Sequence, residues 1–225
     1  MSGVPTRLVF SDVDETLINC KSMFDFLDYY LTGRYGDRGA ATARSVRETL
    51  LAQAASGVPR ERTNRTYFRA WAGESAAEVR RWGQRWFAER SAEPSFYLAA
   101  TREALRGHRA QGAAVVLVSG SFPALLDPIA ADVGAAHVVC TVPQSRGGVL
   151  TGEIVGEPVI GEGKSVAVRE LFGRYPQLDP AECFGYGDHI SDLPMLAAVG
   201  HPVVVGGSAA LLARLPAARR LAAAA

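Results

Sequence analysis

Short apolar runs recur along this chain, and longer stretches with a helical spacing of apolar positions separate them. Two such helical patterns extend from Phe96 to Ala110 and from Val166 to Phe172. Strands that alternate with helices indicate a parallel sheet with helices on both faces. The sequence therefore predicts an α/β fold whose core strands lie in five runs: Leu8–Phe10, Val115–Val118, Val138–Cys140, Cys183–Tyr186 and Pro202–Val205.

Two segments depart from this alternation. Residues 22–93 have a helical pattern, lack a convincing buried strand and carry all three tryptophans. We interpret them as a helical cap domain inserted after the first strand, so that residues 1–21 and 94–225 form the core. Residues 141–161 alternate and are rich in glycine, which predicts a hairpin around Gly147-Gly148. The tail is expected to form a helix with Ser208 as its N-cap.

The bulk composition limits the classes of function. A chain of 225 residues with 48% hydrophobic residues and a net charge of +1 is typical of a globular protein. This charge gives no reason to expect a nucleic-acid or membrane partner, and no apolar stretch approaches the roughly 20 residues that cross a bilayer. The N-terminus lacks a signal-peptide pattern. Three widely spaced cysteines without a C-x-x-C pair favour reduced thiols, so we expect a cytoplasmic protein.

The first candidate for chemistry is the string Asp12-Val13-Asp14-Glu15-Thr16, which follows the first predicted strand. Two carboxylates this close raise each other's pKa unless a cation or hydrogen bonds hold them. Mg²⁺ binds one or two carboxylates together with substrate phosphate oxygens, and an aspartate beside it can act as a nucleophile. For this string alone, the alternative is an Asp-rich turn in which Thr16 caps a helix.

Ser119 and Gly120 directly follow the second predicted strand. In parallel sheets, ligands bind outside the carboxyl ends of the strands. A hydroxyl group and backbone N–H groups at such a position can hold a phosphate oxygen. Taken alone, Ser119 is equally compatible with an N-cap of the helix that follows.

Lys164 is one of only two lysines in the chain, and it lies at the start of a predicted helix. Gly163-Lys164-Ser165 imitates the end of a phosphate-binding loop, but Pro158 stands where the first glycine of that loop is required. We therefore exclude a P-loop nucleotidase. Lys164 is either a solvated surface residue or a cation that neutralises an aspartate and a transferring phosphoryl group.

The last polar segment, Gly187-Asp188-His189-Ile190-Ser191-Asp192, follows the fourth predicted strand. Asp188 and Asp192 are four residues apart and can share one side of a loop or helix. If they face Asp12 and Asp14 across neighbouring strand ends, the four carboxylates complete an acidic metal site. We interpret His189 as a loop residue rather than a ligand or base.

Together these segments resemble the haloacid dehalogenase superfamily, in its phosphoserine-phosphatase-like branch (subfamily IB). The resemblance covers essentially the whole chain, because the helical insertion is similar to the C1-type cap of that family. It implies a Rossmann-like, three-layer α/β/α core and a Mg²⁺-dependent phosphatase that acts on a small-molecule phosphate ester. The matching pieces are Asp12-Val13-Asp14-Glu15-Thr16, Ser119-Gly120, Lys164 and Gly187-Asp188 through Asp192.

The resemblance also implies a role for each matching residue. Asp12 would attack phosphorus and form an aspartyl-phosphate. Asp14 would protonate the leaving alcohol and then activate water, and its main-chain carbonyl would bind Mg²⁺. Asp12 and Asp188 would give the metal side-chain oxygens, while Asp192 would orient Lys164 or the water shell of the metal. The phosphate-binding residues would be Thr16, Ser119, Gly120 and Lys164.

Recognition of the alcohol half of the substrate is less well determined. In phosphoserine phosphatases a glutamate shortly after the first motif binds the substrate ammonium group. This chain has Lys21 in that region, which would repel an amine and favour an anion. Asp25 or Asp28 could replace the glutamate one helical turn later. Candidates for a cap arginine that binds a substrate anion are Arg60, Arg62 and Arg65.

We therefore expect a phosphatase for a small phosphomonoester, with phosphoserine itself as the first alternative. Phosphate esters need an acid for the leaving oxygen and halides do not, so Asp14 favours a phosphatase over a dehalogenase. A phosphotransferase or mutase and a non-catalytic phosphate-binding protein are further alternatives. The sequence leaves open whether the protein is a monomer or a homodimer.

Overall fold

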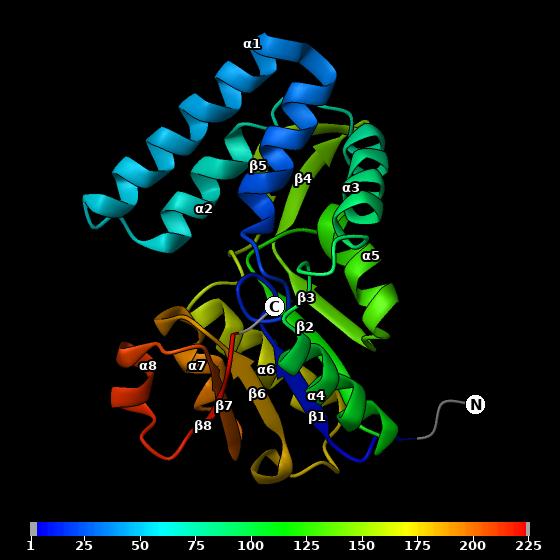
Figure 1. Cartoon of the computed structure of the whole chain (residues 1–225), viewed down its shortest axis with the longest axis vertical. Helices are drawn as coiled ribbons and strands as arrows, with labels where there is room; N and C mark the ends of the chain where they lie inside the picture. The colour runs from blue at the N-terminus through cyan, green and yellow to red at the C-terminus, as the bar shows by residue number, and fades with distance from the viewer. Residues whose placement is uncertain (1–3, 224–225) are drawn as a thin grey trace.

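The computed structural model of the chain describes residues 4–223, and its centre is a six-stranded sheet (Figure 1). All neighbouring strands are parallel, in the order β3-β2-β1-β6-β7-β8. Each of the five predicted runs overlaps a strand of this sheet, although Cys183 lies just before β6, and the sixth strand is formed by the tail. The strands are β1 (Leu8–Ser11), β2 (Ala114–Ser119), β3 (His137–Cys140), β6 (Phe184–Gly187), β7 (His201–Val205) and β8 (Arg219–Leu221).

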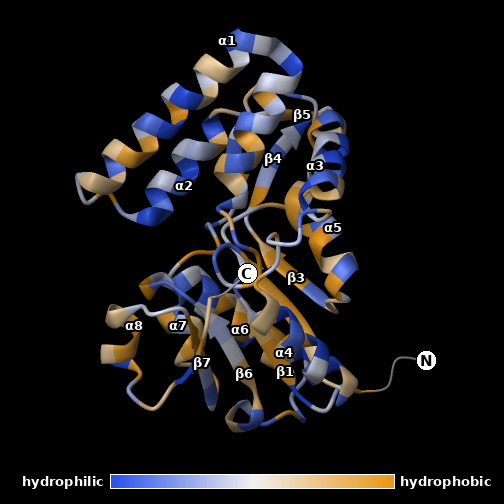
Figure 2. Ribbon diagram, in the orientation of Figure 1, coloured by the Kyte–Doolittle hydropathy of each residue, from blue (hydrophilic) through white to orange (hydrophobic). Residues whose placement is uncertain are grey.

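Apolar side chains cover both faces of the sheet, because successive residues of a strand point to opposite sides. Val9 belongs to a core cluster with α4 (Ala99–Ala110) and α5 (Pro123–Val133). Its neighbour Phe10 belongs to a second cluster. That cluster also contains residues of α6 (Glu162–Arg174), α7 (Leu193–Leu196) and α8 (Ala209–Arg214). The predicted α/β/α layering is confirmed, and Figure 2 shows β1 in hydrophobic colours.

The insertion after β1 is helical and consists of α1 (Ser22–Ala55), α2 (Arg60–Arg69) and α3 (Ala76–Arg90). Helix α1 is interrupted at Gly36, whose φ of 60° and ψ of −143° are conformations that glycine adopts readily. Residues 37–55 therefore turn back toward the sheet, as Figure 1 shows. The tryptophans and their aromatic neighbours mostly form the interior of this region: Phe26, Tyr30, Tyr67, Phe68, Trp71 and Trp86 are fully buried.

The predicted hairpin consists of β4 (Val142–Arg146) and β5 (Val149–Val155), with Gly147 and Gly148 in its turn. The sequence assigned it to the core segment, but the structure packs it against the helical insertion. The backbone N–H of Gly73 donates to the carbonyl of Leu150 at 2.9 Å, and Leu150 N–H donates back to Glu74 at 2.8 Å. This contact joins residues far apart in the chain, so no local pattern indicates it.

The prediction for the tail was wrong in part. Helix α8 is short, Ser208 makes no side-chain capping hydrogen bond, and β8 follows and pairs with β7. The 3₁₀ helices Pro180–Glu182 and Ile190–Asp192 complete the elements. Across residues 4–223, no helix combines the length and the apolar character that a membrane span requires.

Candidate active site

The loop after β1 presents Asp12 and Asp14 at the carboxyl edge of the sheet. Strand β1 lies between β2 and β6, at the point where the chain changes the direction in which it adds strands. This is the usual ligand position of such sheets. Glu15 has a left-handed φ of 58°, which costs about 1–2 kcal/mol for a residue with a side chain. Strain of this kind persists where the surrounding structure holds it, and it concentrates at functional sites.

Lys164 is brought to Asp12 by the first turn of α6. Its ammonium group lies 2.7 Å from Asp12 Oδ1 and 2.7 Å from Asp192 Oδ1, and its side chain is only 3% exposed. A buried ammonium group is stable only when it is paired in this way. Burial lowers the pKa of Lys164, but the two carboxylates together outweigh this effect and raise it, so the ammonium group stays protonated. The structure thus excludes the solvated-surface interpretation of Lys164.

The loop after β6 places the second acidic pair. Asp192 Oδ2 accepts hydrogen bonds from the backbone N–H groups of Asp188 and His189 at 3.1 and 3.0 Å, so both of its oxygens are engaged. Gly187 is required here, because a Cβ atom at this position would lie 2.7 Å from Cβ of Asp192. Asp192 therefore acts as a fixed support for Lys164 and for the loop.

Thr16 has a different role from the one expected. Its hydroxyl donates to Asp188 Oδ1 at 2.8 Å, and the side chain is fully buried. It does not line the cavity in front of Asp12. This placement gives no support to the prediction that Thr16 binds phosphate, and the hydrogen bond lets Thr16 orient the carboxylate of Asp188.

Ser119 and Gly120 lie beside Asp12 in the same cavity, as the strand-end argument predicts. Ser119 Oγ accepts a hydrogen bond from the backbone N–H of Ser121 at 3.1 Å, which leaves its own proton free to donate. Asn64 of α2 donates to the carbonyl of Gly120 at 2.9 Å and fixes this loop against the insertion. Sequence reasoning missed Ser121 and Asn64, because neither belongs to a recognisable motif.

The donor set fits a divalent cation. Oxygens of Asp12, Asp188 and Asp192 lie within 4.8 Å of one another. Within residues 4–223, Asp12 Oδ2, Asp188 Oδ2 and the main-chain carbonyl of Asp14 accept no hydrogen bond. Three hard oxygens are thus available, and hard cations such as Mg²⁺ prefer such ligands.

Burial determines the protonation behaviour of the two acids in the first motif. It raises the pKa of Asp12, and Lys164 only partly opposes this effect. Burial also raises the pKa of Asp14 to about 6, and Ser22 opposes part of this rise. One oxygen of Asp14, Oδ1, is buried without a hydrogen-bond partner in the described part of the chain. A carboxyl group with these properties can carry a proton near neutral pH and give it to a substrate atom.

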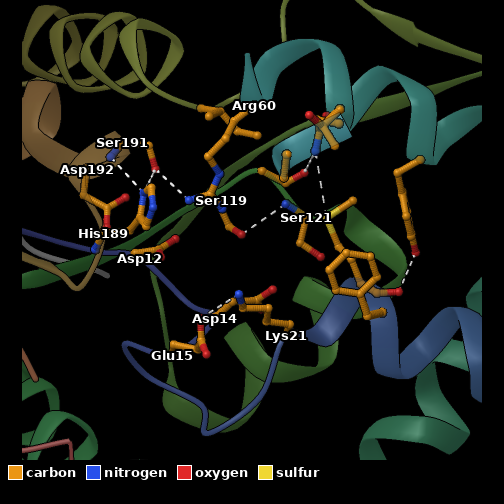
Figure 3. Close-up of a pocket in the computed structure, with 18 of the residues that line it drawn as sticks. Asp12, Asp14, Glu15, Lys21, Arg60, Ser119, Ser121, His189, Ser191 and Asp192 are labelled. Atoms are coloured by element: carbon orange, nitrogen blue, oxygen red, sulfur yellow. Dashed lines mark hydrogen bonds and ion pairs between the residues drawn. The ribbon is translucent and has the colours of Figure 1, made fainter. Parts of the chain in front are cut away.

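A cavity of about 320 Å³ extends from Asp12 to the helical insertion. Figure 3 shows Asp12, Asp14, Ser119 and Arg60 around this space. Of the three arginines considered, only Arg60 lines the cavity, with its guanidinium 3.3 Å from Ser191 Oγ. Arg65 instead binds Glu157 and the carbonyl of Gly156.

The residues proposed for the substrate amine are occupied or lie elsewhere. Asp25 accepts hydrogen bonds from Trp86 at 2.6 Å and from Arg90 at 2.8 Å, and it does not line the cavity. Asp28 is exposed and also lies outside the cavity lining. Lys21 is at the rim, 3.4 Å from Glu15. The structure therefore does not support a replacement of the missing glutamate by Asp25 or Asp28.

Known proteins share both the sequence and the fold. Residues 9–197 match the model of the haloacid dehalogenase-like hydrolase family. A probable phosphatase of Mycobacterium tuberculosis is 42% identical over 103 residues, which are 45% of this chain and 34% of that protein. The match thus spans about a third of the length of that relative. SerB1 of the same organism, named a phosphoserine phosphatase, is 33% identical over 92% of this chain and 67% of its own length.

Two solved structures share the fold of this chain. A Bordetella pertussis protein of unknown function has a TM-score of 0.83 and 28% identity, and the match covers 96% of this chain and 98% of that one. A phosphoserine phosphatase solved as a phospho-aspartyl intermediate analogue has a TM-score of 0.70 and 18% identity, over 96% and 92% of the two chains. With the motif residues gathered at one sheet edge, these matches show that the chain belongs to the haloacid dehalogenase-like hydrolase family.

Proposed function

We propose that this hydrolase is a phosphatase that releases inorganic phosphate from a small phosphomonoester through a phosphorylated Asp12. The observation that carries the proposal is the position of Asp12. It lies at the floor of the cavity, held by a buried lysine and flanked by a second acid. Phosphoryl transfer requires positioning and charge neutralisation more than elaborate covalent chemistry, and this arrangement supplies both.

In the first step, a carboxylate oxygen of Asp12 attacks phosphorus and the bond from phosphorus to the alcohol oxygen breaks. Asp14 gives its proton to that oxygen, so the product leaves as a neutral alcohol. Ser119 and the backbone N–H groups beside it bind the phosphoryl oxygens. Lys164 offsets the negative charge that Asp12 and the phosphoryl group bring together.

In the second step, water attacks the phosphorus of the aspartyl-phosphate and Asp14, now ionised, removes its proton. The bond from phosphorus to the Asp12 oxygen breaks, which releases phosphate and restores the Asp12 carboxylate. Asp12, Asp188 and the carbonyl of Asp14 would hold Mg²⁺. The ion, when bound, would withdraw charge from the phosphoryl oxygens. Asp192 keeps Lys164 and the Asp188 loop in position.

Phosphoserine phosphatase is the second candidate, because SerB1 carries that name and covers most of this chain. An amino-acid substrate would need an acceptor for its ammonium group. The cavity offers Glu15 outside the catalytic cluster, and Glu15 is already paired with Lys21. We therefore favour a different small phosphomonoester.

Replacing Asp14 with asparagine should separate the two steps. With 4-nitrophenyl phosphate, whose leaving group needs little protonation, we expect one equivalent of nitrophenol in a fast burst and then slow turnover. With an alkyl phosphate, kcat/KM should fall by about 10²–10⁴-fold, the usual contribution of a general acid. Stopped-flow absorbance measures the nitrophenol burst, and phosphate release measures kcat/KM for the alkyl phosphate. Equal losses for the two esters, without a burst, would contradict the assignment.

The same acid gives the wild-type enzyme a pH dependence. Burial raises the pKa of Asp14 to about 6, and the first step requires its protonated form. The first step also requires ionised Asp12, whose raised pKa bound Mg²⁺ would lower. In saturating Mg²⁺ we therefore expect kcat/KM for an alkyl phosphate to fall as the pH rises above about 6. The Asp14→Asn variant should lack this decline.

A further inference from the structure

The cavity has two chemically different ends. Its floor carries the charged catalytic residues, whereas its far wall is built almost entirely by the insertion. The insertion contributes six apolar or aromatic side chains to this wall, Met23, Phe24, Leu50, Leu51, Ala54 and Tyr67, and three polar ones, Arg60, Thr63 and Asn64. Because phosphorus must reach Asp12 at the floor, the alcohol half of the substrate must point toward this wall.

The turn at Gly36 explains how these residues reach the site. It sends residues 37–55 back along α2, so that Leu50, Leu51 and Ala54 line the cavity. Leu50 is buried, but Leu51 is 57% exposed. A large apolar side chain exposed at the edge of a substrate cavity is a surface that a substrate can cover, with a gain from burial.

The charges around the wall disfavour an amine. Outside the catalytic cluster, the charged residues that line the cavity are Glu15, Lys21 and Arg60. Glu15 and Lys21 neutralise each other, and Arg60 has no carboxylate partner within 4.0 Å in the part of the chain that the structure describes. An ammonium group here would meet a net positive charge and no free acceptor carboxylate.

We infer that the alcohol half of the substrate is a hydrocarbon group, alkyl or aryl, rather than an amino acid. The inference rests on the proposed phosphatase function of the same site. It makes Leu51 a specificity-determining residue that contacts the hydrocarbon. Each methylene group buried against this wall should favour binding by about threefold to fourfold.

A ladder of n-alkyl phosphates tests this inference. Ethyl, butyl and hexyl phosphate have leaving groups of similar acidity, so differences in kcat/KM report contacts of the chain. With Mg²⁺ and the full chain, we expect kcat/KM to rise about threefold to fourfold per methylene. O-phosphoserine should be at least about tenfold poorer than butyl phosphate. A flat ladder, or phosphoserine above butyl phosphate, would overturn the inference.

A matched pair of variants assigns the effect to the wall. Leu51→Gln should lower the ratio of kcat/KM for hexyl over ethyl phosphate by about threefold or more. Val155→Gln replaces an equally exposed aliphatic residue, 58% exposed and outside the cavity, and should leave that ratio unchanged. An equal change in both variants would contradict the role of Leu51.

Binding of alkylphosphonates separates failure of this inference from failure of the proposed function. These compounds cannot be hydrolysed, and calorimetry measures their dissociation constants directly. Tighter binding of hexyl- than ethylphosphonate by an inactive protein would refute the phosphatase but support the apolar wall. Turnover of 4-nitrophenyl phosphate with no effect of chain length on binding would support the phosphatase function. It would refute the inference that the apolar wall binds a hydrocarbon group.

Discussion

Replacing Asp12 with asparagine is expected to lower kcat/KM for 4-nitrophenyl phosphate by at least about 10⁴-fold, to the level of the background reaction. The amide nitrogen cannot attack phosphorus, and the amide oxygen is a poor nucleophile. The neutral amide would also be a weaker ligand for a divalent cation than the carboxylate. Phosphate release and the absence of a nitrophenol burst measure this loss.

The variant should nevertheless fold. Lys164 keeps its bond to Asp192, and the substitution removes one of three crowded carboxylates. Its thermal midpoint should therefore equal or exceed that of the wild type in the absence of metal. Asp28→Asn is the matched control, because Asp28 is exposed and outside the cavity, and it should retain full activity. If Asp12→Asn keeps a tenth or more of the wild-type activity, Asp12 is not the nucleophile.

Replacing Lys164 with methionine is expected to destabilise the metal-free protein by about 3–5 kcal/mol. The substitution keeps a long, unbranched side chain but removes the ammonium group that pairs with two of the three clustered carboxylates. Chemical denaturation in EDTA measures the loss. Mg²⁺ should restore part of the stability, because it supplies positive charge to the same oxygens.

Lys21→Met is the matched control for this experiment, since Lys21 is the only other lysine in the chain. Its ion pair with Glu15 is about half exposed on both sides, and such pairs contribute roughly 0–1 kcal/mol. If Lys164→Met lowers the free energy of unfolding no more than Lys21→Met does, repulsion among the three buried carboxylates does not destabilise the fold. The charge argument for the site would then be wrong.

The catalytic floor could be predicted because parallel strands bring their carboxyl ends to one edge. Asp12, Ser119 and Asp188 each follow a buried apolar run, so the fold class alone places them together. The position of Lys164 was harder to predict, because this side of its helix could have faced solvent. Its rarity in an arginine-rich chain and the family resemblance were the available signals.

The cap side of the cavity could not be predicted, because it depends on tertiary contacts. Nothing local shows that Asp25 is engaged by Arg90 and Trp86 rather than by substrate. The position of Leu51 depends on the direction of the chain after Gly36, where the helical pattern continues on both sides. Thr16 was assigned to phosphate because its partner, Asp188, lies 172 residues away.

The most direct test of the account is a crystal structure of the chain with beryllofluoride and Mg²⁺. Beryllofluoride mimics a phosphoryl group on a carboxylate. We expect beryllium bonded to an Asp12 oxygen, its fluorides facing Ser119 and Lys164, and the metal between Asp12 and Asp188. Unmodified Asp12, or a metal bound away from Asp188, would contradict the proposed chemistry.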